Sequence, residues 1–340
     1  MEVPEQPTLR DGDVVLRPWR DEDIDPARLQ HDEEMAKRFG FARVIPSHEQ
    51  HEAAVRGWRE GYANGRSTVA FVVERDGHIA GGVDVRQQAE GGAHLSWTLY
   101  AGHGGRGTMT RAVRLLVAYA FDDLGAHRVE AYVHPDNARS LRVAARAGLR
   151  REGLVRGRNN DDRRDAVLLA RLADDPDPFT PGGFTGVLNA FLPTKRVIAQ
   201  GVIRDQHGRV LLCEPTYKKE WDLPGGVVEP HESPRAGLAR EIREELGLDL
   251  EPGRLVTVNW LRPWRGWDDA CAFVFEAATL DADSIATLCL QPTEIRAVHW
   301  CDLPLAHDHV APVTARLLTL LAGGDPVPPY LEAGYAGAGQ

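Results

Sequence analysis

A proline- and glycine-rich break near the middle of the chain most limits what the chain can fold into. Between Ala173 and Pro193 the sequence holds four prolines and three glycines, and the hydrophobic patterns on either side stop there. The chain has 340 residues, which fits two domains of ordinary size. No internal repeat relates the two halves. The sequence therefore predicts two different domains joined by a linker over residues 173–193.

Both halves alternate between patterns typical of strands and of helices. In the first half, strands are expected at 13–19, 69–75, 78–85, 94–100, 128–133 and 165–172, and helices at 47–62, 109–121 and 137–147. In the second half, strands are expected near 196–203, 209–213, 255–261, 270–277 and 295–300, and helices near 234–246 and 311–321. The predicted fold class is therefore mixed α/β (α+β) in each half.

The net charge of −10 is concentrated in the second half. Residues 1–170 contain 25 Lys and Arg against 26 Asp and Glu, whereas residues 171–340 contain 15 against 24. Nucleic acids and anionic membrane surfaces select for a cationic surface, so we expect no nucleic-acid and no membrane partner. The N-terminus lacks the pattern of a secretory signal, and no run of 18 apolar residues occurs. A cytoplasmic protein is predicted.

The most specific pattern is a run of charged residues between Gly226 and Leu248. It reads Gly226, five residues, Glu232, seven residues, and then REIREELGL from Arg240. Glu241, Glu244 and Glu245 are three or four positions apart or adjacent, so all three can project from one side of a helix. Their repulsion favours a bound hard cation, because Mg²⁺ prefers carboxylate oxygens. The alternative is a solvated helix face with exposed ion pairs.

This spacing resembles the Nudix hydrolase box, and every fixed position matches. The resemblance implies an α/β/α sandwich that hydrolyses a nucleoside diphosphate linked to another group, with Mg²⁺ or Mn²⁺ as cofactor. The implied metal ligands are the carbonyl of Gly226 and the carboxylates of Glu241, Glu244 and Glu245. The general base stays open between Glu244, Glu245 and Glu294, a carboxylate outside the box.

In the first half, a glycine-rich turn, AGHGGRG at 101–107, connects an expected strand to an amphipathic helix. Unsatisfied N–H groups and the positive end of the helix dipole coincide at such a place, which favours a diphosphate. Residues 101–170 also carry 13 Lys and Arg against 8 Asp and Glu, which suits an anionic cofactor. The alternative is a flexible loop before a core helix. The expected donors are the backbone N–H groups of Gly105, Arg106, Gly107, Thr108 and Met109.

This half resembles the GNAT N-acetyltransferases, nearest to the RimJ/RimL-like branch that acetylates protein N-terminal amines. The resemblance rests on the strand, glycine turn and helix, and on Asn137, Ser140 and Gly148 at the spacing N-x-x-S-x7-G. It implies a mixed sheet with helices, acetyl-CoA as cofactor and an amine as acceptor.

The GNAT resemblance also assigns roles to single residues. Asn137 is expected to hold the pantetheine arm and Ser140 to protonate the departing thiolate, although both residue types commonly cap helices. The backbone of Trp97, Thr98 and Leu99 is expected to pair with the pantetheine amides.

Two positions of the glycine turn depart from the family pattern. Gly104 replaces a basic residue and Met109 replaces a small one. Arg106 or Arg111 could supply the missing charge. The candidates for the base that deprotonates the amine are His94 and His103.

The leading hypothesis is a bifunctional protein, a CoA-dependent N-acetyltransferase of an amine fused to a Mg²⁺-dependent hydrolase of a nucleoside diphosphate derivative. One alternative is a Nudix hydrolase whose degenerate GNAT domain only binds a ligand or partner; another is a non-catalytic nucleotide sensor. Neither the substrates nor the oligomeric state is predicted. The expected parts are a GNAT-like domain at 8–172, the linker at 173–193, a Nudix domain at 194–322 and a flexible tail at 323–340.

Overall fold

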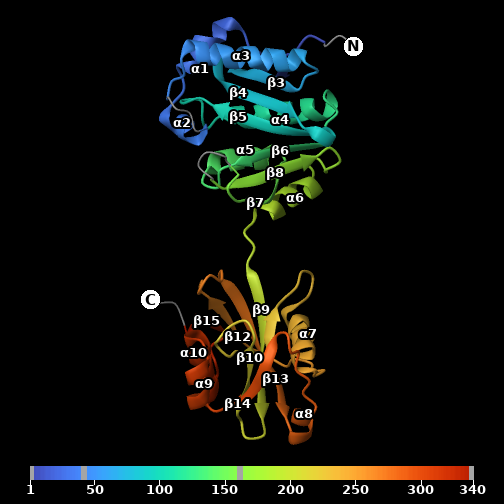
Figure 1. Cartoon of the computed structure of the whole chain (residues 1–340), viewed down its shortest axis with the longest axis vertical. Helices are drawn as coiled ribbons and strands as arrows, with labels where there is room; N and C mark the ends of the chain where they lie inside the picture. Colours follow the sequence, from blue (N-terminus) through green and yellow to red (C-terminus); the bar gives the residue numbers. More distant parts are fainter. Residues whose placement is uncertain (1–3, 40–43, 159–163, 337–340) are drawn as a thin grey trace. The chain divides into compact units, whose positions relative to one another are not determined.

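The computed structural model describes residues 4–39, 44–158 and 164–336. The chain divides into two compact units, residues 1–192 and 193–340, and each unit is built on its own sheet (Figure 1). The predicted mixed α/β fold class is confirmed for both. In the part of the chain that is described, no helix has the length and apolar character needed to cross a membrane.

An eight-stranded sheet forms the first unit. Its strand order is β1 (Leu9–Asp11), β2 (Val14–Pro18), β3 (Thr68–Arg75), β4 (His78–Gln87), β5 (Gly92–Leu99), β6 (Arg128–Val133), β8 (Ala166–Leu172) and β7 (Arg150–Val155). Neighbouring strands are antiparallel, except that β5 and β6 are parallel. The α-helices are α1 (Ile24–Arg28), α2 (Glu33–Phe39), α3 (His48–Ala63), α4 (Thr108–Asp122), α5 (Ala138–Arg146) and α6 (Pro181–Phe191).

Separate hydrophobic clusters fill the two faces of this sheet. The apolar residues of α4 recur at helical spacing, and Ala112 and Leu116 are fully buried in one cluster with Phe71 of β3. Side chains alternate along a strand, so Ala70 and Val72 point to the other face, where they pack with α1 and α3. The period of each segment thus decides which of its residues enter which core.

β5 and β6 pair only where both strands begin. Gly92–His94 pair with Arg128–Glu130, and the described residues show no pairing between these strands beyond that point. β5 pairs with β4 along most of its length, from Ala93 to Leu99. The backbone groups of β5 that point toward β6 after His94 therefore have no strand partner.

The sheet of the second unit is also mixed. Its order is β14 (Ile295–Cys301), β10 (Val210–Pro215), β9 (Arg196–Asp205), β13 (Ala270–Leu280), β12 (Leu255–Leu261), β15 (Tyr330–Glu332) and β16 (Tyr335–Ala336), with β11 (Gly225–Val227) paired to β9. The helices are α7 (Pro234–Leu246), α8 (Ala282–Ala286), α9 (Leu303–His309) and α10 (Pro312–Ala322).

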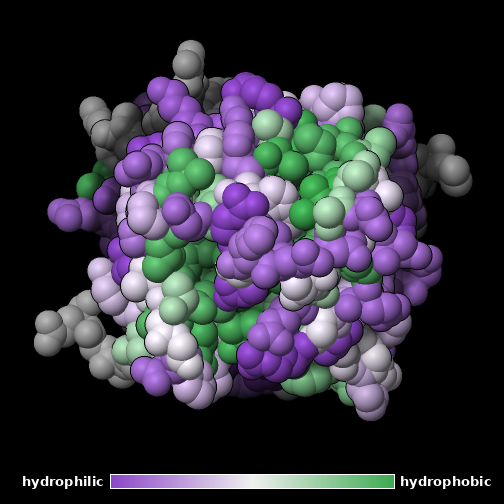
Figure 2. All heavy atoms as spheres, turned by 90° about the horizontal axis from the view of Figure 1, so that it is seen from below, coloured by the Kyte–Doolittle hydropathy of each residue, from purple (hydrophilic) through white to green (hydrophobic). Residues whose placement is uncertain are grey.

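Two hydrophobic clusters lie on opposite faces of this second sheet. Leu238 and Ile242 of α7 are fully buried in one, and Leu317 and Leu318 of α10 are buried in the other. Helices therefore cover both faces, which confirms the predicted α/β/α sandwich. On the face of the molecule shown in Figure 2, hydrophobic patches are separated by bands of hydrophilic residues.

The segment expected as a linker, residues 173–193, mostly folds onto the first unit. Residues Pro181–Phe191 form α6, whose start is capped by the Thr180 hydroxyl and by proline in the first turn. Pro178 packs so closely on Gly148 that a Cβ on that glycine would lie 2.8 Å from its Cγ. Proline and glycine here shape a turn and a helix start, so this segment is not a free linker.

The tail expected to be flexible, residues 323–340, adds two strands to the second sheet. β15 pairs in parallel with β12, and β16 pairs with β15. Leu331 is fully buried in the apolar cluster below α10. The free edge of β12 and one apolar anchor therefore order this segment up to residue 336, and residues 337–340 lie outside the described part.

Candidate functional sites

Local sequence fixes both ends of α7, the helix that carries the candidate metal ligands. The Ser233 hydroxyl accepts a hydrogen bond from the N–H of Ala236, and Pro234 occupies the first turn. Gly247 ends the helix with φ +70°, the left-handed conformation that glycine adopts without strain. These caps set the register in which the glutamates face the loop before the helix.

The guanidinium of Arg240 holds three carboxylates. Nη1 donates to Glu241 Oε1 and to Glu244 Oε2, both at 3.0 Å. Nη2 donates to Glu232 Oε1 at 2.8 Å and to the carbonyl of Val227 at 3.1 Å. Arg240 lowers the pKa of Glu232 chiefly through this hydrogen bond. Arg240 therefore fixes the positions of carboxylates that would otherwise repel one another.

Two glycines bring the backbone of β11 against these carboxylates. A Cβ on Gly226 would lie 2.6 Å from Cδ of Glu241, closer than side-chain atoms pack. Gly225 has φ +129°, and its Cβ would lie 2.1 Å from the carbonyl oxygen of Ala199. Side chains are excluded at both positions, so the Gly226 backbone and the Glu241 carboxylate are neighbours, as expected for two ligands of one ion.

Glu245 is the most buried of the predicted ligands. Its side chain is 8% exposed, and Oε2 accepts a hydrogen bond from the N–H of Gly225 at 3.0 Å. Burial, together with the nearby charges of Glu241 and Glu294, raises the pKa of Glu245 to about 8. Burial also raises the pKa of Glu241. The fold thus places Glu294, an exposed residue just before β14, where its charge acts on both predicted ligands.

The oxygen donors of this site suit a hard divalent cation in chemical type. They are carboxylates plus a backbone carbonyl, and a cation would offset the cost of burying Glu245 in charged form. In the described part of the chain, however, no three His, Cys, Asp or Glu side chains are grouped tightly enough to form a metal site. Arg240 lies among the carboxylates instead. The oxygen donors therefore fit a hard cation in chemical type, but Arg240 and not a tight group of carboxylates occupies their centre.

In the first unit, the glycine turn has left-handed backbone conformations in an open setting. Gly105 has φ +81° and Gly107 has φ +74°, and a Cβ at either would meet nothing within 4 Å. Gly107 is the N-cap of α4, and no side chain caps the N–H groups there. The backbone conformation, and not crowding, therefore calls for glycine, and the first N–H groups of α4 remain available to a ligand.

One arginine fixes the turn to the start of α4. Arg75 Nη1 donates to the carbonyl of Arg106 at 3.0 Å and to Thr108 Oγ1 at 2.9 Å. Thr108 is buried, whereas the Arg106 side chain is exposed. Arg106 can therefore face an anion, and Arg75, which the sequence reading did not single out, orders the backbone that would bind it.

The two departures from the family pattern are accommodated by the structure. Gly104 lies outside the left-handed region, and a Cβ there would meet nothing within 4 Å. The Met109 side chain is buried in the core below α4. Arg111 cannot replace the missing basic residue in this conformation, because its guanidinium pairs with Asp11 and Asp13. Of the two substitutes considered, only Arg106 is free to serve.

The predicted acyl-chain residues lie along the open side of β5. Trp97, Thr98 and Leu99 pair with β4 on one side, while no strand among the described residues pairs with them on the β6 side. Their outward N–H and carbonyl groups could therefore pair with an extended amide chain.

Asn137 is the N-cap of α5, and its Oδ1 accepts a hydrogen bond from the N–H of Ser140 at 3.1 Å. The amide Nδ2 of Asn137 has no hydrogen-bond acceptor within the described residues. Ser140 is half-buried, and no hydrogen bond to its hydroxyl is formed there either. Both the capping role and a role toward a ligand are thus compatible with this position.

Asp84 on β4 carries a mostly buried carboxyl group, 15% exposed, that the sequence reading missed. It pairs across the sheet with Ser96, so both side chains lie on the same face. Arg86 Nη2 lies 3.0 Å from Asp84 Oδ1, but the geometry is not that of a hydrogen bond, and this buried oxygen has no other partner among the described residues. Burial raises the pKa of Asp84 to about 6. An Asp inside an otherwise apolar strand was the available signal.

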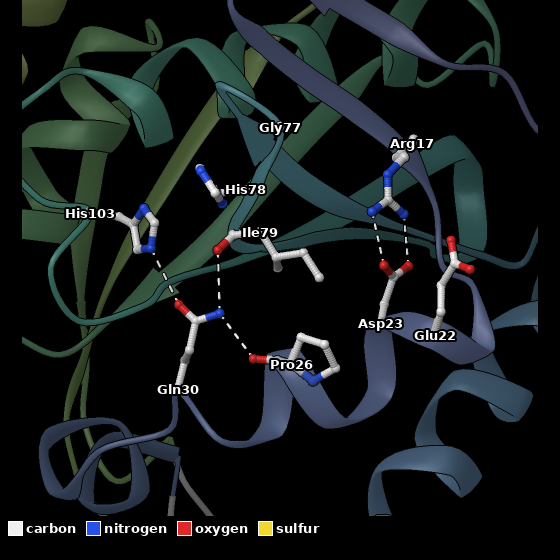
Figure 3. A pocket seen from close by; sticks show the side chains of 9 residues that line it. All are labelled: Arg17, Glu22, Asp23, Pro26, Gln30, Gly77, His78, Ile79 and His103. Atoms are coloured by element: carbon white, nitrogen blue, oxygen red, sulfur yellow. Dashed lines mark hydrogen bonds and ion pairs between the residues drawn. The ribbon is translucent and has the colours of Figure 1, made fainter.

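The two histidines considered as bases have different surroundings. His94 stacks on Tyr132, with ring centroids 5.7 Å apart, and burial lowers its pKa. His103 lies beside a cavity of about 470 Å³, where its Nε2 is 3.3 Å from Gln30 Oε1 (Figure 3). Neither is brought to the open side of β5 by these contacts.

Known families match the two units separately. The family model described as an acetyltransferase (GNAT) domain matches residues 13–150, and the one described as a NUDIX domain matches residues 194–321. The chain therefore contains a GNAT acetyltransferase domain at residues 13–150 and a Nudix hydrolase domain at residues 194–321.

Individual relatives also match one half each. A MutT-like protein of Streptomyces ambofaciens is 33% identical over 135 residues, which are 39% of this chain and 82% of that protein. The probable N-acetyltransferase YjcK of Bacillus subtilis is 43% identical over 84 residues, 24% of this chain and 46% of that protein, so less than half of YjcK is matched. The structure of Mycobacterium smegmatis RimJ in complex with CoA-disulfide is 23% identical, with 52% of this chain and 88% of that chain covered and a TM-score of 0.44.

Proposed function

We propose that the second unit hydrolyses a nucleoside diphosphate linked to another group, with Mg²⁺ or Mn²⁺ as cofactor. The observation that supports it is the gathering of Glu232, Glu241 and Glu244 around Arg240, beside a Gly226 that leaves room for the Glu241 carboxylate. A solvated helix face would need neither that arginine nor that glycine. The ligands we assign are the carbonyl of Gly226 and the carboxylates of Glu241, Glu244 and Glu245.

In this reaction the chain's own residues orient the ligands and accept a proton. A divalent cation bound there would activate water and offset the charge of the diphosphate. Arg240 holds Glu241 and Glu244 in place, and the N–H of Gly225 holds Glu245. We assign proton acceptance from the attacking water to Glu294, because it is exposed near the ligands and no hydrogen bond within the described residues occupies its carboxylate.

Glu244→Gln tests this assignment in the full-length protein with Mg²⁺. We expect the variant to lose release of phosphate, measured after phosphatase treatment, across a panel of nucleotide sugars, dinucleotides and oxidised nucleoside triphosphates. Glu251→Gln removes an exposed carboxylate outside the motif and should behave as the wild type. Unchanged turnover by Glu244→Gln would contradict the assignment of this site. Glu294→Gln should lower kcat while leaving metal affinity unchanged.

We further propose that the first unit transfers the acetyl group of acetyl-CoA to an amine. The supporting observation is that the uncapped start of α4 and the unpaired side of β5 belong to consecutive segments, joined by the glycine turn. The N–H groups of Gly105 to Met109 would hold the diphosphate. The backbone of Trp97 to Leu99 would pair with the pantetheine, Asn137 would hold its arm through Nδ2, and Ser140 would protonate the leaving thiolate.

Calorimetric titration of the protein with acetyl-CoA tests this second activity. We expect the wild type to bind acetyl-CoA. We expect Ser140→Ala to lower the rate of acetyl transfer to a panel of amines without lowering the affinity for acetyl-CoA. Absence of acetyl-CoA binding would favour a first unit that has lost this function.

A further inference from the structure

A second cavity in the Nudix unit, of about 350 Å³, is formed by three segments distant in sequence. The segment before the glycines contributes Lys219 and Glu220, and the connection between β12 and β13 contributes Trp264 and Arg265. The end of α9 contributes Asp308 and His309. A cavity of this size is at the lower end of small-molecule sites.

The β12–β13 connection presents an indole to solvent from a rigid turn. The N–H of Trp264 donates to the carbonyl of Trp267 at 3.0 Å, and the N–H of Trp267 donates back at 2.9 Å. Between them Arg265 and Gly266 both have left-handed φ values, of 47° and 89°, as a two-residue hairpin turn needs. Trp264 is 49% exposed and Trp267 is 55% exposed. The Arg265 guanidinium lies over the Trp264 ring and the Arg196 guanidinium over the Trp267 ring, each 5.2 Å from the ring centroid, yet both indoles keep about half of their surface exposed.

The other walls of the cavity are held by contacts of their own. The Trp221 ring is stacked between His299, with centroids 3.8 Å apart, and His309, with centroids 3.9 Å apart. The N–H of Trp221 also donates to the His309 carbonyl at 2.9 Å. An ion pair between Arg265 and Glu220 fastens the hairpin turn to the segment before the glycines. The cavity is therefore largely preformed.

The same segment also reaches the candidate hydrolytic site. Lys218 Nζ donates to Asp222 Oδ2 at 2.7 Å, and the Asp222 charge acts on the buried carboxyl group of Glu245. Lys219, the next residue, lines the cavity. One segment therefore connects the two places, because Lys218 contacts a carboxylate near Glu245 and Lys219 lines the cavity.

The chemistry of the cavity fits a planar, hydrogen-bonding ring better than a second phosphate. Lys219 and Arg265 are balanced by Glu220 and Asp308, so no net positive charge gathers there. An exposed indole offers a face for stacking, and carboxylates accept hydrogen bonds from ring N–H and amino groups. We propose that this cavity binds the nucleobase of the hydrolase substrate, stacked on Trp264. This inference rests on the proposed hydrolysis of a nucleoside diphosphate derivative.

Calorimetry on the full-length protein with Ca²⁺ tests the proposal, with ADP, GDP, CDP and UDP as nucleotide probes and inorganic pyrophosphate as a probe without a base. Stacking is worth about 1–3 kcal/mol per base, so Trp264→Ala should weaken the best-bound nucleotide about 5- to 150-fold. The affinity for pyrophosphate should be the same in Trp264→Ala as in the wild type. Trp264→Phe should restore most of the affinity, which a folding defect would not allow.

Trp267→Ala is the matched control, because Trp267 belongs to the same turn and is equally exposed but does not line the cavity. Its nucleotide affinity should stay within about twofold. The base site would be overturned if Trp264→Ala weakened pyrophosphate and nucleotides equally, or if it changed no affinity. It would also be overturned if Trp267→Ala lost as much nucleotide affinity as Trp264→Ala, as expected for a docking surface that uses both tryptophans. Lack of nucleotide binding by the wild type would overturn it too.

Hydrolysis assays separate this inference from the function on which it rests. If the wild type hydrolyses a nucleotide and Trp264→Ala leaves its KM unchanged, the base site is wrong and the hydrolase stands. If the wild type hydrolyses nothing in the panel, the proposed function itself fails. The expected result is a raised KM with kcat nearly unchanged.

Discussion

The two candidate sites both use glycines, but for opposite physical reasons. At the Nudix site, a Cβ on Gly226 would lie 2.6 Å from a carboxylate carbon, so glycine is needed because the space is filled. At the glycine turn before α4, a Cβ on Gly105 or Gly107 would meet nothing within 4 Å, so glycine is needed there only for its left-handed φ. Gly104 has neither constraint.

This difference explains why one motif matches its family at every fixed position and the other does not. In the crowded site, several residues of the motif contact one another, as Arg240 does with Glu232 and Glu244. In the open turn, the expected donors are backbone N–H groups, so the residue types at positions 104 and 109 can change without displacing them. Substitutions should therefore affect the first site far more than the second.

The largest effect is expected for Gly226→Ala. The new methyl group must displace the Glu241 carboxylate, which is the mobile end of a side chain, so the fold should tolerate it while the ligand moves. We expect hydrolysis to fall by roughly 100-fold, with a melting temperature close to that of the wild type. A variant with full activity would show that Glu241 is not a ligand at this position.

Arg240→Lys should come next. One ammonium group cannot hold three carboxylates and a carbonyl at once, so we expect about 10- to 100-fold weaker metal affinity, read from the Mg²⁺ dependence of hydrolysis. Arg243→Lys is the control, because Arg243 pairs only with exposed Asp249 among the described residues. If both variants lose the same affinity, the network around Arg240 has no special role.

A smaller effect is expected for Asp84→Asn in the first unit, in the pH dependence of stability. The folded-state pKa of Asp84, about 6, exceeds the usual 3.8, so the folded protein binds this proton more tightly than the unfolded chain does. Its contribution favours folding below about pH 4 and declines as the pH rises to about 6, by at most about 3 kcal/mol. The difference in melting temperature between variant and wild type should shift in favour of the variant across this range. A difference independent of pH would contradict the raised pKa.

The smallest effects concern the open turn. Gly107→Ala places a Cβ in the left-handed conformation at a cost of about 1–2 kcal/mol, and should weaken acetyl-CoA binding or lower the melting temperature of the first unit. Gly104→Ala should change neither measurably. If Gly104→Ala lowered acetyl-CoA affinity or the melting temperature more than Gly107→Ala did, the space around the turn, and not its backbone conformation, would explain the need for glycine.

Elements with a long periodic pattern could be predicted from the sequence. The apolar residues of α4 and the capped ends of α3 and α7 are local, and the structure has these helices. β11, β15 and β16 have only two or three residues, too few for a periodic pattern, and they exist because a partner strand lies beside them. The sequence also did not predict six other short elements, each of seven residues or fewer: β1, β7, α1, α2, α8 and α9.

The candidate sites follow the same division. Arg240 and the glutamates lie on or next to one helix, so their grouping follows from spacing. The unpaired side of β5, the pairing of Asp84 with Ser96 and the cavity beside Trp264 arise where separate segments meet. Sequence spacing carries no information on those meetings, and only the register of the strands and the loop contacts reveals them.

The parallel pairing of β15 with β12 has a consequence for solubility. Val258, Asn259 and Trp260 meet Tyr330, Leu331 and Glu332 along this border. Without that cover, β12 would present a row of free N–H and carbonyl groups, the template on which chains stack into aggregates. The last described residues thus act as a built-in guard against self-association of the sheet.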